Sequence, residues 1–293
     1  MEPMSLRTRR TLAIGSFFLF IVILPVAALY ASGYRLSGFS LVSTGGIHVS
    51  VPISNVAISL NGEVVERSNL FNKSFFFDNL EPGAYVVQTS VDEYMPWTKT
   101  LVVESQFVTD VVMTAIPQPI RFLELVSSAT STEQTATSTM KFVDIETFEE
   151  IESVFLATTT VNVQEAATTT ESDVALEENI PQRGGIALYL ADGDVRVAWE
   201  RESTPPSIFC TRPSLCVGEI ILEQGDETVT DAVFYRNGLL YRTEESGVFF
   251  TEIDVRQPRL QVSVYTSPGA EYAVIRGKLY VRDEQTIYES AEF

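Results

Sequence analysis

An unbroken run of uncharged, mostly apolar residues from Thr11 to Ala31 dominates the start of the chain. As a helix rising about 1.5 Å per residue, this run would reach roughly 30 Å, the thickness of a bilayer's hydrocarbon core. Lipid offers no partners for backbone N–H and C=O groups, so a single span must be helical. The pattern predicts a transmembrane helix over residues 11–32, with Tyr30 and Tyr34 where interfacial aromatic rings are enriched.

Alternation of apolar and polar residues takes over after this span and predicts strands. Ile47–Val51 and Val56–Leu60 alternate. The Asn61-Gly62 pair that follows is a strong hairpin signal, because both residue types accept the positive φ angles of a type I′ turn. Further short strand patterns with turns between them are typical of a β-sandwich, which we expect over residues 33–119.

Several motifs of this region together resemble PEGA domains. The family is named for a Pro-Glu-Gly-Ala turn, and here the order is Glu81-Pro82-Gly83-Ala84. The resemblance implies a small β-sandwich, found mainly in surface and envelope proteins of prokaryotes, with a structural or binding role. The motifs that carry it are Gly45-Gly46-Ile47, the Asn61-Gly62 hairpin, Leu80–Val87 and Tyr94-Met95-Pro96-Trp97.

Tyr94 and Trp97 flank a Met-Pro pair at one of the predicted connections between strands. One interpretation is that both rings cap an end of the sandwich core. The other is that they form an aromatic platform for a sugar ring or a peptide. On the second interpretation, Tyr94 and Trp97 are the candidate binding surface of this chain.

Residues 120–182 are rich in Ser, Thr and acidic residues, a composition that buries too little apolar surface to offset the entropy of ordering. We therefore expect a linker here. Within it, apolar residues recur at three- and four-residue spacing and predict a short amphipathic helix. That helix either docks onto a neighbouring domain or binds a partner. Its apolar residues are Phe142, Ile145, Phe148, Ile151, Phe155 and Leu156.

Strand patterns return in residues 183–293 and contain a weak internal repeat. Ala232–Tyr241 resembles Tyr272–Tyr280, at an offset of about 40 residues, which is the length of one propeller blade. The region is too short for the four blades of a closed propeller. We expect an incomplete propeller-like stack, an open β arrangement or pairing with another chain, with exposed edges that the linker helix could protect. The predicted fold class is mainly β.

Charge is distributed unevenly and predicts the orientation of the span. Residues 1–35 carry four arginines and one acid, a net of 4 − 1 = +3, within a chain whose net charge is −19. By the positive-inside rule, residues 1–10 stay in the cytoplasm and the bulk is extracytoplasmic in a single-pass cell-membrane protein. A cleaved signal peptide, with Val26-Ala27-Ala28 as its cleavage context, is the competing interpretation. The acidic bulk argues against nucleic-acid binding.

Cys210 and Cys216 are the only cysteines, and they enclose a short polar segment with a proline. In an oxidising compartment such a pair predicts a disulfide, with roughly 2 kcal/mol of chain-entropy stabilisation for so short a loop. A metal site is the alternative. It would need two more soft or imidazole ligands, and the single histidine, His48, is distant in sequence.

The sequence contains no persuasive constellation for catalysis or for a cofactor. A Ser-His-Asp or Cys-His arrangement needs a histidine, and only His48 exists. We therefore expect a non-catalytic envelope protein that contacts cell-wall glycan or surface proteins. A sensor or assembly factor acting through a membrane partner is the alternative, and a carboxylate-dependent glycan-active enzyme is the third candidate.

Overall fold

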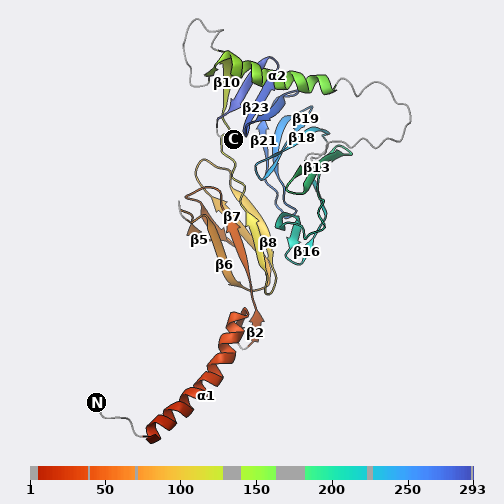
Figure 1. The fold of residues 1–293 in the computed structure, drawn as a ribbon. Helices are drawn as coiled ribbons and strands as arrows, with labels where there is room; N and C mark the ends of the chain where they lie inside the picture. Colours follow the sequence, from red (N-terminus) through yellow and green to blue (C-terminus); the bar gives the residue numbers. More distant parts are fainter. Residues whose placement is uncertain are drawn as a thin grey trace, which may run out of the picture.

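The computed structural model describes residues 6–38, 40–69, 72–127, 140–162, 182–222, 227–291 and 293. The start of the predicted cytoplasmic segment and the Ser/Thr-rich parts of the predicted linker lie outside these residues. The fold is mainly β with one N-terminal apolar helix, as the sequence predicts. Figure 1 shows the helix, a β-sandwich and a stack of sheets following one another along the long axis.

Helix α1 spans Leu6–Ala31 and is long and apolar enough to cross a membrane. An 18-residue stretch within Arg7–Ala31 reaches a mean hydropathy of 2.7, and none of that stretch is buried against the body. Pro25 lies inside the helix without ending it. The helix begins before the predicted span because the arginine-rich stretch that precedes the apolar run is also helical and forms its first turns.

A short hairpin, absent from the sequence prediction, connects α1 to the body. Strands β1 (Tyr34–Ser37) and β2 (Ser40–Ser43) pair antiparallel over four residues each. Thr44 closes the base of this hairpin, since its backbone N–H and its hydroxyl both donate to the carbonyl of Gly33.

The predicted β-sandwich forms from seven strands in two sheets. The three-stranded sheet has the order β6-β3-β9, with β3 and β9 parallel, and the four-stranded sheet has the order β5-β4-β7-β8. The alternating residues of the sequence pattern fill the core between them, including Ile47, Ile58 and Leu101. The strands are β3 (Gly45–Ser50), β4 (Ala57–Leu60), β5 (Glu63–Arg67), β6 (Ser74–Leu80), β7 (Gly83–Ser90), β8 (Trp97–Val103) and β9 (Val108–Val112).

Three further sheets stack upon one another beyond the sandwich. The first sheet (β12-β13-β14-β17) shares an apolar cluster with the second sheet (β18-β19-β20-β21), and the second shares another with the third. Three consecutive blade-like sheets make the incomplete propeller-like stack that the repeat predicts. Their strands are β12 (Gln182–Arg183), β13 (Ile186–Ala191), β14 (Asp194–Trp199), β17 (Glu219–Leu222), β18 (Val229–Tyr235), β19 (Gly238–Thr243), β20 (Gly247–Glu252), β21 (Gln261–Tyr265), β22 (Glu271–Ile275), β23 (Lys278–Asp283) and β24 (Thr286–Ser290).

The two copies of the internal repeat are the β18–β19 hairpin of the second sheet and the β22–β23 hairpin of the third. β18–β19 and β22–β23 each turn in two residues, and β13–β14 does the same in the first sheet. Arg236, Arg276 and Asp192 occupy the first turn position with φ between 51° and 58°. The shared turn explains why the sequences of the second and third hairpins are similar.

The third sheet is completed by strands from the segment predicted to be a linker. β10 (Phe122–Ser127) pairs antiparallel with β24, and β11 (Met140–Val143) extends the sheet, giving the order β11-β10-β24-β23-β22. The linker boundary at residue 120 is therefore wrong for this part. The prediction missed β10 because its partner strand lies at the other end of the chain.

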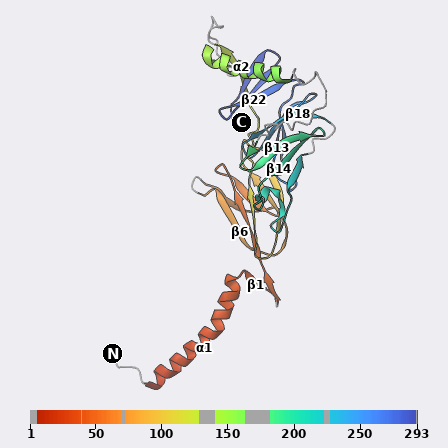
Figure 2. The ribbon, with the colours of Figure 1, turned by 45° about the vertical axis from the view of Figure 1, so that its right-hand side comes forward.

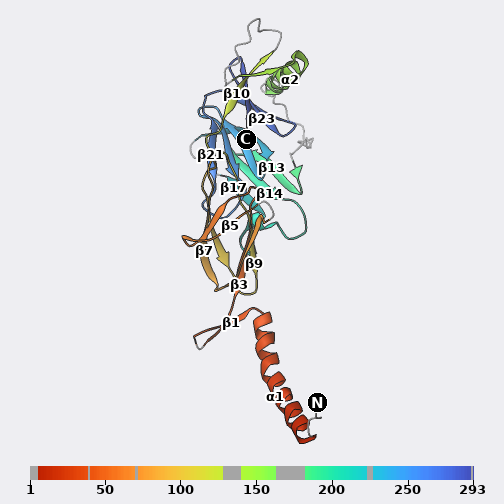
Figure 3. The same ribbon diagram turned by 90° about the vertical axis from the view of Figure 1, so that its left-hand side faces the viewer.

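The predicted amphipathic helix forms and covers the last sheet. Helix α2 (Ile145–Asn162) packs Ile151 and Phe155 against Leu125, Tyr280 and other buried residues of the third sheet. Figures 1 and 3 show α2 lying across the end of the stack. The helix thus covers the sheet face where a further propeller blade would pack.

Candidate functional site

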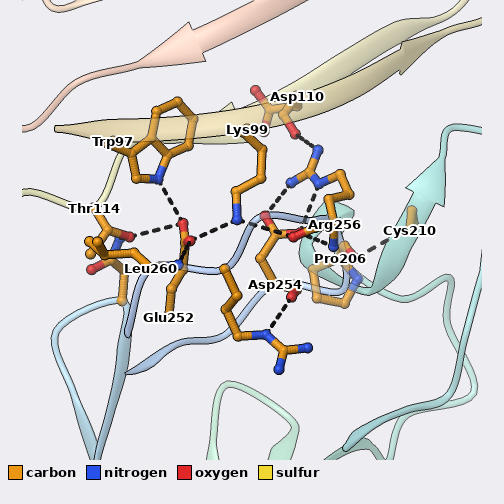
Figure 4. A network of polar contacts seen from close by, with 12 residues as sticks. Trp97, Lys99, Asp110, Thr114, Pro206, Cys210, Glu252, Asp254, Arg256 and Leu260 are labelled. Atoms are coloured by element: carbon orange, nitrogen blue, oxygen red, sulfur yellow. Dashed lines mark hydrogen bonds and ion pairs between the residues drawn. The ribbon is translucent and has the colours of Figure 1, made fainter. Parts of the chain in front are cut away.

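A buried polar network joins the sandwich to the second sheet (Figure 4). Glu252, at the end of β20, accepts hydrogen bonds from Trp97 Nε1 at 3.0 Å, Lys99 Nζ at 2.7 Å and Thr114 Oγ1 at 3.1 Å. The backbone N–H of Leu260 adds a fourth donor at 3.3 Å. Lys99 is fully buried and Glu252 is 3% exposed, so their charges neutralise each other away from water.

A second buried ion pair lies beside the first, in the loop between β20 and β21. Arg256 donates from Nε and Nη2 to the two carboxylate oxygens of Asp254, at 2.8 and 2.7 Å. Its Nη1 reaches across to the carbonyl of Asp110 in β9, at 2.9 Å. Bidentate pairing of this kind fixes geometry as well as charge. The two networks together hold the sandwich and the sheet stack as one body.

The cysteine pair forms the predicted disulfide and shapes a third contact. Cys210 and Cys216 close the hairpin of β15 (Cys210–Arg212) and β16 (Leu215–Cys216), which follows the short 3₁₀ helix η1 (Ser207–Phe209). At the hairpin tip, Ser214 donates from its N–H and hydroxyl to the carboxylate of Glu104 in the sandwich. These hydrogen bonds, led by the hydroxyl, lower the pKa of Glu104 although its partial desolvation opposes them.

A pocket of about 500 Å³ opens at the same junction. The sandwich contributes Val112, the first sheet Ile186 and Trp199, and the second sheet Phe234. Most of the lining is therefore apolar. Its volume lies within the range of pockets that bind small ligands or a few side chains, roughly 300–1,000 Å³. Pro206, Ile208 and Ile253 complete the apolar wall.

The charges that line this pocket are not equivalent. Glu252 and Asp254 border it, but their carboxylates are bonded inward to Lys99 and to Arg256. Arg183 and Arg236 also line the pocket, and one guanidinium N–H of Arg183 donates to the carbonyl of Arg236. The guanidinium of Arg236 lies over the rings of Tyr235 and Phe293, whereas Arg183 is exposed at the pocket edge. An apolar pocket with this arginine beside it favours a ligand that combines an apolar group with a negative charge.

Trp97 and Tyr94, the candidate binding surface from the sequence, have separate environments. Trp97 is fully buried, and its indole N–H is bonded to Glu252. A binding platform needs an accessible ring face, so Trp97 has a packing role in this structure. Tyr94 is half-buried and forms an isolated β-bridge with Pro117. Aromatic residues that do line the pocket are Trp199 and Phe234, and the strand pattern gave no means to identify this role.

The structure also brings the single histidine between a serine and an aspartate. On the outer face of the β6-β3-β9 sheet, His48 contacts Asp110 through Nδ1 at 2.5 Å and Ser74 through Nε2. The sequence alone indicated no persuasive arrangement of this kind because His48 is the single histidine, and it did not indicate which serine or aspartate would lie beside it. A hydrolase also needs oxyanion donors and an acyl pocket. Ser74 instead begins a regular strand paired with Ser50 on an open sheet face.

Comparisons with known proteins do not add an assignment. No protein-family model matches the chain, and no curated protein sequence matches it. The PEGA resemblance therefore stays a prediction from the motifs. Within the described part of the chain, no group of three or more His, Cys, Asp or Glu side chains is arranged to hold a metal ion.

Proposed function

We propose that this chain is a single-pass membrane protein that presents a rigid β body on the extracytoplasmic side and binds a partner there without catalysis. The observation that carries the proposal is the preformed apolar pocket at the junction of the two β units, which are the β-sandwich and the stack of three sheets. The apolar helix α1 and the cysteine pair support an exported, tethered body. The PEGA resemblance gives the same expectation of an envelope protein.

The pocket favours a surface protein over cell-wall glycan as the partner. Its wall is mostly apolar, whereas a sugar ring needs several hydrogen-bonding groups beside an aromatic face. The exposed Arg183 at the pocket edge favours a carboxylate in the bound segment. We therefore propose that the pocket accepts an exposed peptide segment in which an apolar side chain stands next to an acidic residue or a free C-terminus.

Selection of short peptides tests the binding proposal directly. The full chain in lipid nanodiscs is used to select from a phage-displayed hexapeptide library, and we expect enrichment of apolar residues beside Asp or Glu. Ile208→Asp places a charge in the apolar wall and should abolish the enrichment. Ile221→Asp is the matched control, because Ile221 is an exposed isoleucine on β17 of the first sheet and does not line the pocket.

The outcomes separate binding from non-specific capture. Enrichment lost in Ile208→Asp and kept in Ile221→Asp supports the pocket. Equal enrichment by both variants rejects peptide binding in the pocket, and so does a wild-type chain that enriches no peptide above empty nanodiscs. Orientation is tested separately by adding protease to intact cells, which should digest the body. A body that survives intact contradicts the proposed topology.

A further inference from the structure

The β1–β2 hairpin, between the anchor helix and the body, exposes a pair of large apolar side chains. Leu36 and Leu41 are direct cross-strand partners, so their side chains are neighbours on one face of the hairpin. They are 74% and 56% exposed. Burial in the sandwich core does not account for them, and water is an unfavourable environment for two adjacent leucines.

Specific contacts hold this hairpin in place relative to the helix. Two hydrogen bonds from Thr44 to the carbonyl of Gly33, at 2.7 and 2.8 Å, close its base. Arg35 donates from Nε to Asn79 of the sandwich at 2.6 Å, and its guanidinium carbon lies 3.3 Å from the centre of the Tyr30 ring. Because Tyr30 belongs to α1, the hairpin is bonded to both the anchor and the body.

The position of the two leucines relative to a membrane that α1 spans follows from their distance to the end of this helix. Leu36 comes five residues after Ala31, the last residue of α1. The polar headgroup region adds only about 5–8 Å on each side of the hydrocarbon core. Figures 2 and 3 show the hairpin turning back from the body toward the last turns of α1. A membrane that α1 spans would therefore have its outer surface at the level of this hairpin.

We infer that the Leu36–Leu41 face of the hairpin is a membrane foot, which inserts into the interfacial region of the bilayer that α1 spans. This inference rests on the proposed membrane anchoring. Apolar side chains at the boundary between headgroups and acyl chains are a common mode of interfacial attachment. A helix alone lets the body tilt and rotate. A second contact beside the helix restricts both motions and so directs the pocket of the body in one way relative to the membrane.

Site-specific fluorescence in the full chain tests the membrane foot. Single cysteines at Leu41→Cys, Val64→Cys and Phe18→Cys are labelled with the environment-sensitive dye NBD, while the native cysteines stay in their disulfide. The protein is reconstituted in vesicles of phosphatidylethanolamine and phosphatidylglycerol. Quenching is then measured with aqueous iodide and with lipids that carry a doxyl group near the headgroup or at the bilayer centre. Val64, 64% exposed on β5, is the control for a water-facing strand residue.

We expect the label at 41 to be quenched by shallow doxyl lipid at least about twofold more than the label at 64, and to be protected from iodide. Adding Leu36→Ser to the labelled chain should raise iodide access at 41, whereas Val65→Ser should not. If the label at 41 responds like the label at 64 while the label at 18 is quenched by deep doxyl lipid, the Leu36–Leu41 face does not insert into the bilayer. The proposal that α1 spans the membrane is then kept.

Two other outcomes also overturn the foot. Iodide protection at 41 without lipid quenching means that a second copy or another protein covers this face. Iodide access at 18 means that α1 does not span the bilayer, in which case the proposed anchoring fails and the foot fails with it. The label at 18 thus distinguishes failure of the proposed function from failure of this inference.

Discussion

Lys99 carries a buried charge at the junction between the β-sandwich and the second sheet. Its ammonium group is completely buried, is neutralised by Glu252, and also donates a hydrogen bond to the carbonyl of Arg256. Removing one member of a buried ion pair leaves the other charge in a low-dielectric interior, at a cost of about 3–5 kcal/mol. We expect Lys99→Met to lower the free energy of unfolding by this amount, measured by denaturant unfolding in detergent.

Two variants control for this effect. The double variant Lys99→Met/Glu252→Gln removes both charges and keeps an oxygen for Trp97, so it should recover most of the loss. Lys73→Met alters an exposed lysine and should change stability by less than about 0.5 kcal/mol. If Lys99→Met is as stable as Lys73→Met, the buried pair does not hold the units together.

The contacts of Glu289 predict how the stability of the protein changes as the pH falls. Burial alone would raise the pKa of this carboxyl, but the hydrogen bonds from Lys141 and Lys278 outweigh it and lower the pKa below 4.5. A lowered folded-state pKa gives stability that is present above the unfolded pKa and is lost as the pH falls through the folded pKa. Acidification from about pH 6 to pH 3 should therefore lower the melting temperature less in Glu289→Gln than in the wild type.

Other carboxylates contribute to the acid response equally in both proteins, so the difference between the two curves isolates Glu289. If the melting temperatures of the two proteins fall by the same amount across this pH range, the contacts of Glu289 with Lys141 and Lys278 contribute no stability. A melting temperature that falls more steeply with acidification in Glu289→Gln than in the wild type would contradict the prediction.

Ser74 provides a chemical test of the non-catalytic proposal. Its hydroxyl contacts His48, which contacts Asp110, so both side-chain contacts of a Ser-His-Asp triad are present. Because Ser74 lies in a regular strand on an open sheet face, we expect no labelling by a fluorophosphonate probe. Labelling at Ser74 that disappears in His48→Gln would show an activated nucleophile and would contradict the proposal.

Local pattern predicted individual elements better than their partners. Strand alternation and the Asn61-Gly62 turn gave the sandwich, and the three- and four-residue spacing gave α2. Strand β10 was missed because a short strand needs a partner to be recognised, and its partner β24 is at the far end of the chain. The β1–β2 hairpin was missed because it has few residues and adjoins a much stronger apolar signal.

Helix α2 yields a prediction at the scale of elements. Phe155 is 1% exposed against the third sheet, whereas its neighbour Leu156 is 57% exposed. Phe155→Ala should lower the free energy of unfolding by about 3 kcal/mol, the low end for a buried Phe, because the helix can detach as a unit. Leu156→Ala is the matched control and should be nearly neutral. Equal effects, measured by denaturant unfolding, would mean that α2 does not cover the sheet.

At the scale of the whole molecule, the junction has no counterpart in local sequence. Trp97, Lys99 and Glu252 belong to patterns that predict strands, and nothing in those patterns indicates that the three side chains meet. The pocket arises in the same way, since Val112, Trp199 and Phe234 come from three different sheets. A site assembled by tertiary packing is visible only when the relative placement of the sheets is known.

Because the junction is buried and charged, we expect the two β units to unfold together. Replacing both tryptophans with 5-fluorotryptophan gives one ¹⁹F signal from Trp97 in the sandwich and one from Trp199 in the first sheet, assigned with Trp199→Phe. On heating the full chain, both signals should lose native intensity at one midpoint, because separating the units exposes Lys99 and Glu252 without partners. In Lys99→Met the two midpoints should separate. Two distinct midpoints in the wild type would mean that the sandwich and the sheet stack are independent domains, in which case a pocket formed between them could not be preformed.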